Sequence, residues 1–375
     1  MKQKHNGFLG KYLWLQKHRF IFKQVGCNYF IRLSFFFIFA VLLFSTSGCV
    51  SNGRPRVRLG AYFGAPLGIA YPNPNNLGKH SYSSCWGERI GLLYTSKGGF
   101  IDLGHVRDSA DRTRYCTQVA YENLISDKTE FSFRLMEPSE YLVKIKYPEN
   151  WDGQVDKENI AREISIEIGQ NLAYDSMIWH EIITWYGYKF TGVFSEYISA
   201  FSWEDVYSDI IGIEIAGRAL RKDSDKYDSV MTKLIYDELH DLDVQPVSVA
   251  KKAEKKVKGK WYKGLIYPFA TLKKRNMDIG IDDGYVTPWL VPGVCQNTKP
   301  FLVAVPNLDL LQKYGFSIEV MIEPKVRIKK KLLRVAYPDG KGKYIEPAAQ
   351  FPEFMRDIIN NEKKRNGKDV DVPNL

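Results

Sequence analysis

Ser176-Met-Ile-Trp-His-Glu-Ile-Ile-Thr-Trp-Tyr186 is the stretch around which the rest of this chain is organised. It sets a histidine beside a glutamate inside an apolar, aromatic-rich run. Upstream, apolar residues recur at helical spacing from Ile160 to Leu172, and Asp156 stands where a helix N-cap is expected. The pattern predicts one long core helix from about Asp156 to Tyr186.

His180 and Glu181 give this helix its chemical interest. On a helix, His180 and Thr184 lie one turn apart on one face, the spacing with which H-E-x-x-H directs two imidazoles at one zinc ion. Threonine is a poor substitute for the second imidazole. The segment therefore predicts a metal site only if further ligands come from elsewhere, with Thr184 supporting them rather than binding the metal.

A second segment, Ser199 to Gly212, leads into a helix that is expected to end near Arg221. Its part from Asp205 to Gly212 resembles the second motif of thermolysin-like metallopeptidases, a Glu-x-x-Ser-Asp run. The resemblance implies that Asp205, 25 residues after His180, is the third zinc ligand and that Asp209 orients a ligand histidine. Ser202 to Asp205 also fits a capping box, so capping and ligation both remain open for Asp205.

A third polar segment follows the Gly98-Gly99 turn and runs into a helix that is expected to reach Ile125. It carries His105, Arg107, Asp108 and Asp111 among apolar neighbours. His105 shares a helix face with Asp108 one turn later. His105 is either a buried histidine satisfied by hydrogen bonds or a metal ligand, in which case Asp108 would support it.

The first 49 residues predict a lipoprotein signal peptide. Seven basic residues and no acid precede an apolar run from Leu33 to Phe44, which is too short to span a bilayer comfortably. Ser45-Thr-Ser-Gly-Cys49 resembles a bacterial lipobox, which implies acylation of Cys49 with fatty acids such as palmitate. Val50 in the next position favours the outer membrane, facing the periplasm, with the cell surface as the alternative.

Charge and cysteine usage narrow the class of protein. Without the seven leader charges the formal net charge falls from +10 to +3, so no nucleic-acid partner is expected. The lysine-rich run 251–260 is either a solvated face or a contact with anionic phospholipid or lipopolysaccharide. Of the three remaining cysteines, Cys85 and Cys116 are expected to form a disulfide because they share the amino-terminal half.

The predicted fold is one α+β domain over residues 50–375, with a possible subdivision near 242–260. A helical core carries the His-Glu motif, and short antiparallel strands flank it. Strands are expected at 56–63 and 89–94, as a pair within 130–146, and as a pair around 316–335. Further helices are expected at 227–242 and 352–364.

Three motifs together, Gly99 to Thr113, Trp179 to Gly187 and Ser199 to Gly212, resemble a family of bacterial envelope proteins called domain of unknown function 4056. This resemblance carries no activity with it. The residues themselves suggest a metal-dependent hydrolase of a peptide or peptidoglycan-type substrate. His105, His180 and Asp205 would hold one Zn²⁺, Glu181 would act as general base, and Tyr186 or Arg107 would stabilise the oxyanion.

Two other functions remain open at this stage. The chain could be a non-catalytic envelope lipoprotein that binds a protein partner or the cell wall, its polar clusters serving only to knit the core. It could also be a cysteine hydrolase that pairs Cys85 with His105, although nothing around Cys85 marks an activated thiolate.

Overall fold

The computed structural model describes residues 53–56, 58, 71–84, 86–189, 196–264 and 271–366. By internal contacts the chain divides into two units, Met1–Cys49 and Val50–Leu375, and every described residue belongs to the second. That unit combines long helices with short antiparallel strands, so the predicted α+β class is confirmed. The leader, the lipobox and Cys49 lie outside the described residues.

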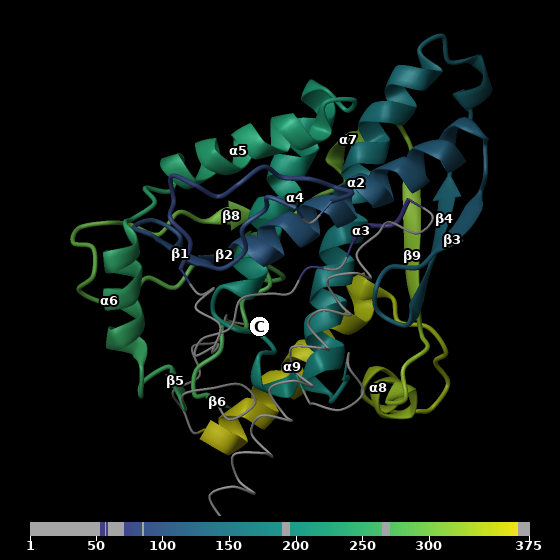
Figure 1. The fold of residues 1–375 in the computed structure, drawn as a ribbon. Helices are drawn as coiled ribbons and strands as arrows, with labels where there is room; N and C mark the ends of the chain where they lie inside the picture. Colours follow the sequence, from purple (N-terminus) through teal and green to yellow (C-terminus); the bar gives the residue numbers. More distant parts are fainter. Residues whose placement is uncertain are drawn as a thin grey trace, which may run out of the picture. The chain divides into compact units, whose positions relative to one another are not determined.

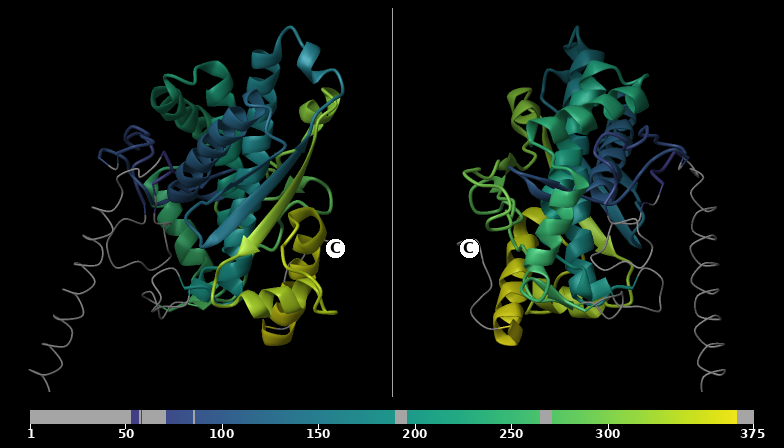
Figure 2. Two further views of the ribbon diagram at one scale, coloured as in Figure 1. Left: turned by 90° about the vertical axis from the view of Figure 1, so that its right-hand side faces the viewer. Right: turned by 60° about the vertical axis from the view of Figure 1, so that its left-hand side comes forward.

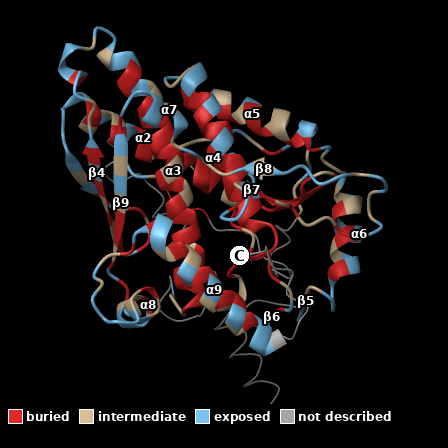
Figure 3. Cartoon of the chain, turned by 180° about the vertical axis from the view of Figure 1, so that it is seen from behind, coloured by how far each residue is buried: buried red, intermediate tan, exposed pale blue. Residues whose placement is uncertain are grey.

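Three helices form the centre of this unit: α2 (Leu103–Ile125), α3 (Lys157–Trp185) and α4 (Asp205–Lys222). Each packs against the other two, as Figure 1 shows. They are largely buried (Figure 3), and their apolar faces contribute much of the main hydrophobic core. The predicted helix around His180 is therefore central, and nearly all of its second half is buried.

Two glycines let these helices approach closely. A Cβ added to Gly169 on α3 would lie 2.7 Å from the backbone nitrogen of Thr117 on α2. A Cβ on Gly212 of α4 would lie 2.2 Å from the carbonyl oxygen of Val106 on α2. Neither contact could be relieved by a side-chain rotation alone, because backbone atoms are involved. These positions set the spacing of α3 and α4 from α2.

A three-stranded antiparallel sheet lies beside the helical core, in the order β3 (Glu130–Phe133), β4 (Ser139–Lys146), β9 (Ser317–Pro324). Figure 2 shows β4 and β9 running alongside each other. Alternate residues of β4 are buried, as expected of a strand with one face on a core. The predicted strands within 130–146 are therefore present.

The predicted strand pair around 316–335 is wrong in its second half. β9 pairs with β4, and the chain then forms helix α8 (Lys329–Ala336). Leu332 and Ala336 are the buried residues of this helix, one turn apart, while its lysines lie further out. The apolar positions follow a helical period, which the basic residues between them concealed.

The remaining elements complete the unit. Helix α5 (Tyr227–Asp241) packs on α4, and α6 (Val247–Val257) packs on β1 (Leu92–Thr95) through Ala250, Ala253 and Val257. The lysine-rich run thus begins inside a helix. The others are β2 (Gly99–Asp102), η1 (Trp151–Gly153), η2 (Glu196–Ile198), β5 (Tyr262–Lys263), β6 (Thr271–Leu272), β7 (Tyr285–Val286), β8 (Val303–Ala304), α7 (Asp309–Lys313) and α9 (Pro347–Asn366).

Two further observations concern the membrane and the thiols. Among the described residues, no helix is long and apolar enough to span a membrane. Cys116 is a free thiol buried on α2, and its expected disulfide partner, Cys85, lies outside the described residues. Cys295 is also free.

The strand expected at 56–63 is not present in the residues that the structure describes there. Arg56 and Arg58 are the described residues of this range, and neither is in a strand.

Candidate functional site

His105 lies in the first turn of α2, where Asp102 caps the helix by accepting a hydrogen bond from the Gly104 backbone N–H at 2.6 Å. Its Nδ1 is 3.0 Å from the Asp209 carboxylate on α4, and its Nε2 is 3.5 Å from an oxygen of Asp205. Asp209 therefore contacts a histidine through its carboxylate. The histidine is His105, from a distant part of the chain.

His180 has a carboxylate of its own. Its Nδ1 lies 3.0 Å from Glu137 Oε1, in the segment between β3 and β4. Two nitrogens of Arg112 on α2 hold the two oxygens of Glu137 at 3.2 and 2.9 Å, and Arg112 Nε donates to Asp108 at 2.8 Å. Asp108 thus supports His180, through Arg112 and Glu137, and not His105.

Glu137 and Arg112 were missed by the sequence reasoning. Arg112 follows Asp108 at i,i+4 spacing, and that spacing was an available signal for the pair. Glu137 offered no such signal, because it sits at the start of a turn and meets α2 and α3 only in the folded chain. Arg112 and buried His180 both favour its ionised form over the opposing effect of burial, and the pKa of Glu137 falls to about 2.

Glu181, the predicted general base, lies near the other predicted residues of the site. Its carboxylate accepts a hydrogen bond from the Phe201 backbone N–H at 2.5 Å. Burial and the nearby Asp205 raise the pKa of Glu181 to about 7, while His180 and His105 act in the opposite direction. Glu181 is therefore within electrostatic reach of Asp205 and of both histidines. We call His105, His180, Glu181, Asp205 and Asp209 the histidine–carboxylate site.

Asp205 makes the capping contact that its sequence context allowed, and it also lies against His105. One oxygen accepts a hydrogen bond from the Ser202 backbone N–H at 3.0 Å, which is the backbone half of a capping arrangement. The other oxygen faces His105. Helix α4 begins at Asp205 itself, with Glu204 as N-cap residue, so the predicted cap at Ser202 is displaced by two residues.

Charge is concentrated in this site. Burial raises the pKa of Asp205 and of Asp209 to about 6 each, against the opposing pull of His105. Burial and Asp205 raise the pKa of Glu204 well above its usual range. Burial lowers the pKa of His180, but Glu137 outweighs this and brings it to about 9. Asp205, Asp209 and Glu204 are thus buried acids held close together in this part of the molecule.

The two imidazoles are the parts of the site that reach solvent. The side chains of His105 and His180 are 17% and 19% exposed, whereas Glu181 and Asp209 are buried. Because both Nδ1 atoms face carboxylates, the Nε2 edges are the ones available for other contacts. For His105 that edge already faces Asp205.

Three predicted residues lie outside this arrangement. Arg107 donates to the Leu77 carbonyl oxygen at 3.0 Å, and Tyr186 donates from its hydroxyl to Asp357 at 2.5 Å, so neither is placed to stabilise an oxyanion here. The reason is helical geometry, which turns Arg107 to a different face of α2 from His105. Thr184 is buried, and its hydroxyl has no hydrogen-bond partner among the described residues.

The site contains side chains that commonly bind metal ions, but they are not arranged around a common point. Imidazoles whose Nδ1 is held by a carboxylate are typical of zinc sites, and carboxylates are common ligands. Across the described residues, however, no group of three or more His, Cys, Asp or Glu side chains is arranged to hold a metal ion. Ligation would therefore require side chains such as Asp205 to turn.

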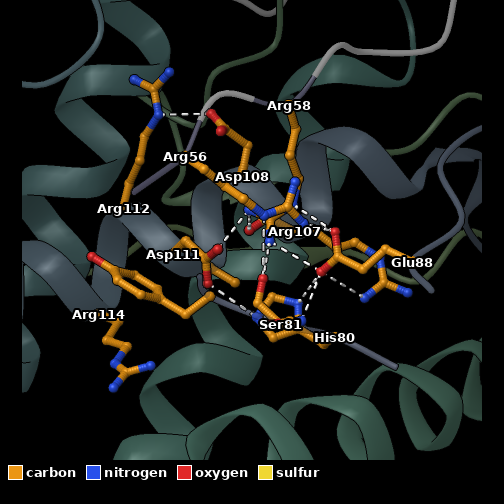
Figure 4. Close-up of polar contacts among 12 residues, drawn as sticks. Arg56, Arg58, His80, Ser81, Glu88, Arg107, Asp108, Asp111, Arg112 and Arg114 are labelled. Carbon is orange, nitrogen blue, oxygen red and sulfur yellow. Dashed lines mark hydrogen bonds and ion pairs between the residues drawn. The ribbon is translucent and has the colours of Figure 1, made fainter. Parts of the chain in front are cut away.

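A separate polar cluster occupies another face of α2 (Figure 4). Asp111 lies 2.6 Å from Arg58 and 3.0 Å from His80, and Glu88 pairs with Arg56 and Arg58. Arg107 belongs to this cluster, 3.6 Å from Glu88. These buried ion pairs fasten the segment before β1 onto α2. The figure also shows the ion pair of Arg112 with Asp108.

Fold and site together define an α+β protein whose three central helices hold a partly accessible histidine–carboxylate site. Residues 70–277, more than half of the chain, match the family model described as protein of unknown function (DUF4056), and the chain belongs to that family. The family suggested by the three sequence motifs is thereby confirmed. No curated protein and no solved structure matches the chain. The likeness to thermolysin-like metallopeptidases rests on the sequence pattern alone.

Proposed function

We propose that the histidine–carboxylate site is the reaction centre of a metal-dependent hydrolase. The observation that supports this proposal is that Glu181 on α3 interacts electrostatically with His180, with His105 on α2 and with Asp205 on α4, while each histidine contacts a carboxylate through its Nδ1. Burial of so many acids and imidazoles is costly unless each has a partner or a function. Glu181 accepts a hydrogen bond from the Phe201 backbone N–H, and Glu204 accepts one from the Ser202 hydroxyl. Among the described residues neither glutamate forms an ion pair, although burial and the nearby Asp205 raise the pKa of each.

In this proposal His105, His180 and Asp205 would hold one Zn²⁺, which when bound supplies a Lewis acid and an activated water. Asp209 and Glu137 would keep each imidazole in the tautomer whose Nε2 is available. Since His180 is protonated in the metal-free protein at neutral pH, binding would release a proton. Asp205 would use the oxygen that does not accept from Ser202.

Glu181 is the proposed general base. It is adjacent to His180 in sequence, interacts electrostatically with both histidines, and is fixed by the Phe201 backbone N–H. A carboxylate so placed can take a proton from water and return it to a leaving group. An envelope peptide or peptidoglycan-type amide is the proposed substrate. The proposal assigns no role to Arg107 or Tyr186.

Elemental analysis tests the metal. We expect wild-type protein purified without chelators to carry near one equivalent of zinc, and His180→Ala and His105→Ala to lose it. Glu181→Gln should keep the metal, because a general base is not a ligand. Folded wild-type protein that stays metal-free even after incubation with zinc would overturn the metal assignment.

Hydrolysis is tested separately, with purified peptidoglycan fragments and peptides analysed by mass spectrometry. Glu181→Gln should abolish product formation, and Glu163→Gln, an exposed change on the same helix, should leave it intact. Loss of product of about 10²-fold or more is expected from removal of a general base. If the wild type cleaves none of these substrates, a non-catalytic envelope-binding function takes the place of the hydrolase.

A further inference from the structure

Arg114 on α2 lies outside the histidine–carboxylate site and is held in an unusual setting. Its guanidinium carbon is 4.4 Å from the centre of the Tyr82 ring and 4.7 Å from the centre of the Tyr227 ring. Figure 4 shows the side chain pointing away from the buried cluster of Arg58, His80 and Asp111. Stacking on aromatic faces fixes the plane of a guanidinium without using its N–H donors.

Both tyrosines are themselves fixed. The Tyr227 hydroxyl donates to the Ala110 carbonyl oxygen at 2.9 Å, and its ring packs edge-on against His80 with centroids 5.6 Å apart. The Tyr82 hydroxyl donates to the Gly53 carbonyl oxygen at 2.5 Å. Arg114 is therefore preorganised by two side chains from distant parts of the chain, Tyr82 before β1 and Tyr227 at the start of α5.

The donors of Arg114 are not used up within the protein. Among the described residues its guanidinium makes no hydrogen bond, and its nearest acid is Asp228, at 3.8 Å. Asp228 accepts the Tyr82 backbone N–H through one oxygen only. The side chains of Arg114 and Asp228 are 32% and 42% exposed, so both can meet a ligand.

A cavity of about 400 Å³ opens beside this pair. Tyr82, Arg114, Asp225, Lys226, Tyr227 and Asp228 line it, and we call it the Arg114 pocket. Lys226 pairs with Asp223 at 3.2 Å and its side chain is 76% exposed, whereas Arg114 is held in place by the two tyrosine rings. The wall thus offers one preorganised cation, neighbouring acids and two aromatic rings.

We propose that the Arg114 pocket binds the head group of an α-amino acid. Arg114 would take the carboxylate in its forked geometry, Asp228 the ammonium group, and the tyrosine rings the aliphatic part. In an α-amino acid both charges are carried on one carbon, which suits an arginine and an aspartate that lie side by side. A simple anion would face Asp225 and Asp228, and a simple cation would face Arg114.

The same head group occurs in a free amino acid and at the unlinked end of a diamino acid within a cell-wall peptide. Calorimetric titration of the purified full chain with alanine and with a tripeptide ending in diaminopimelate distinguishes the two sources. Acetate and methylammonium serve as half-ligands. We expect alanine or the tripeptide to bind more tightly than either half-ligand, because only they satisfy both charges.

Variants locate the binding. Arg114→Gln and Asp228→Asn should each weaken it by at least about tenfold, since each removes a hydrogen bond to a charged group. The affinity of Arg114→Lys should lie between those of the wild type and Arg114→Gln, because lysine keeps the positive charge but lacks the forked pair of N–H donors. Arg218→Gln, on the exposed face of α4, is the matched control and should bind as the wild type does.

Circular dichroism establishes that each variant is folded before titration. Binding of acetate as tight as that of alanine would show a plain anion site and overturn the proposal. So would equal binding by wild type and Arg114→Gln, or no binding of alanine and the tripeptide in the millimolar range. None of these results depends on hydrolysis or zinc. The test of the Arg114 pocket is therefore independent of the test of the histidine–carboxylate site.

Discussion

Asp175 is a carboxyl group on α3 whose ionisation is opposed by burial alone. Burial raises its pKa from 3.8 to about 8, and no positive partner among the described residues compensates. A group with a raised pKa in the folded state contributes stability that is fully present below the unfolded pKa and is lost as pH rises through the folded one. Asp175 therefore costs stability progressively between about pH 4 and pH 8.

Asp175→Asn removes this titration while keeping the shape of the side chain. We expect the variant to be more stable than the wild type at pH 9, on the order of a few kcal/mol, because each pKa unit corresponds to about 1.4 kcal/mol. The difference should close near pH 4, where Asp175 is largely protonated in either state. Urea unfolding at the two pH values measures it.

A matched control is Asp152→Asn, since Asp152 is almost fully exposed. It should leave the pH dependence of the unfolding free energy unchanged. If Asp175→Asn and wild type unfold with the same free energy at pH 9, the carboxyl group is not desolvated as described.

At the scale of elements, the packing of α2 against α4 brings His105 next to Asp205 and Asp209. His105 stands on α2, and Asp205 and Asp209 stand on α4, so the 3.0 Å contact from His105 to Asp209 depends on how closely these helices pack. Gly212 follows Asp209 by three residues on α4 and lies against the Val106 carbonyl oxygen of α2. The helix spacing and the site geometry are therefore linked.

Gly212→Ala should force the two helices apart. Its new Cβ would meet the Val106 carbonyl oxygen at 2.2 Å, and overpacking of this kind typically costs about 1–3 kcal/mol. We expect a lower urea midpoint and, if the site binds zinc, a lower metal content. Alanine has a higher helix propensity than glycine, so without the close contact the substitution would stabilise α4. A stabilised variant would therefore contradict the close packing of α2 and α4.

Gly153→Ala is the control for that experiment, because nothing lies within 4 Å of a Cβ at this position. It should change the unfolding free energy by no more than about 0.5 kcal/mol, as is usual for surface substitutions.

At the scale of the whole molecule, the proposed lipid anchor decides where the folded unit works. The anchor is a proposal from the sequence around Cys49, which lies outside the described residues. Cys49→Ala should abolish labelling by a fatty-acid probe in a bacterial host, because the acylated thiol is removed. Cys295→Ala, which removes another free thiol, should label as the wild type does. Labelling that survives Cys49→Ala would refute the anchor.

The sequence alone was sufficient for those features that depend on local periodicity. The apolar spacing from Ile160 to Trp179 predicted α3, and the helices that became α2, α4 and α5 were predicted close to their actual bounds. The same patterns fixed the α+β class. They also marked His105, His180 and Asp205 as polar residues in apolar surroundings, since the pattern along an element shows which residues face the core.

Partnerships between elements were decided only by the tertiary structure. Asp209 holds His105, while His180 is held by Glu137, a residue that no local pattern singles out. Arg107 turned out to face a different ion network, because two residues along a helix rotate a side chain to another face. Helix periodicity determines which residues are buried, but the packing of separate elements determines which buried groups meet, and the chemistry of the site depends on those meetings.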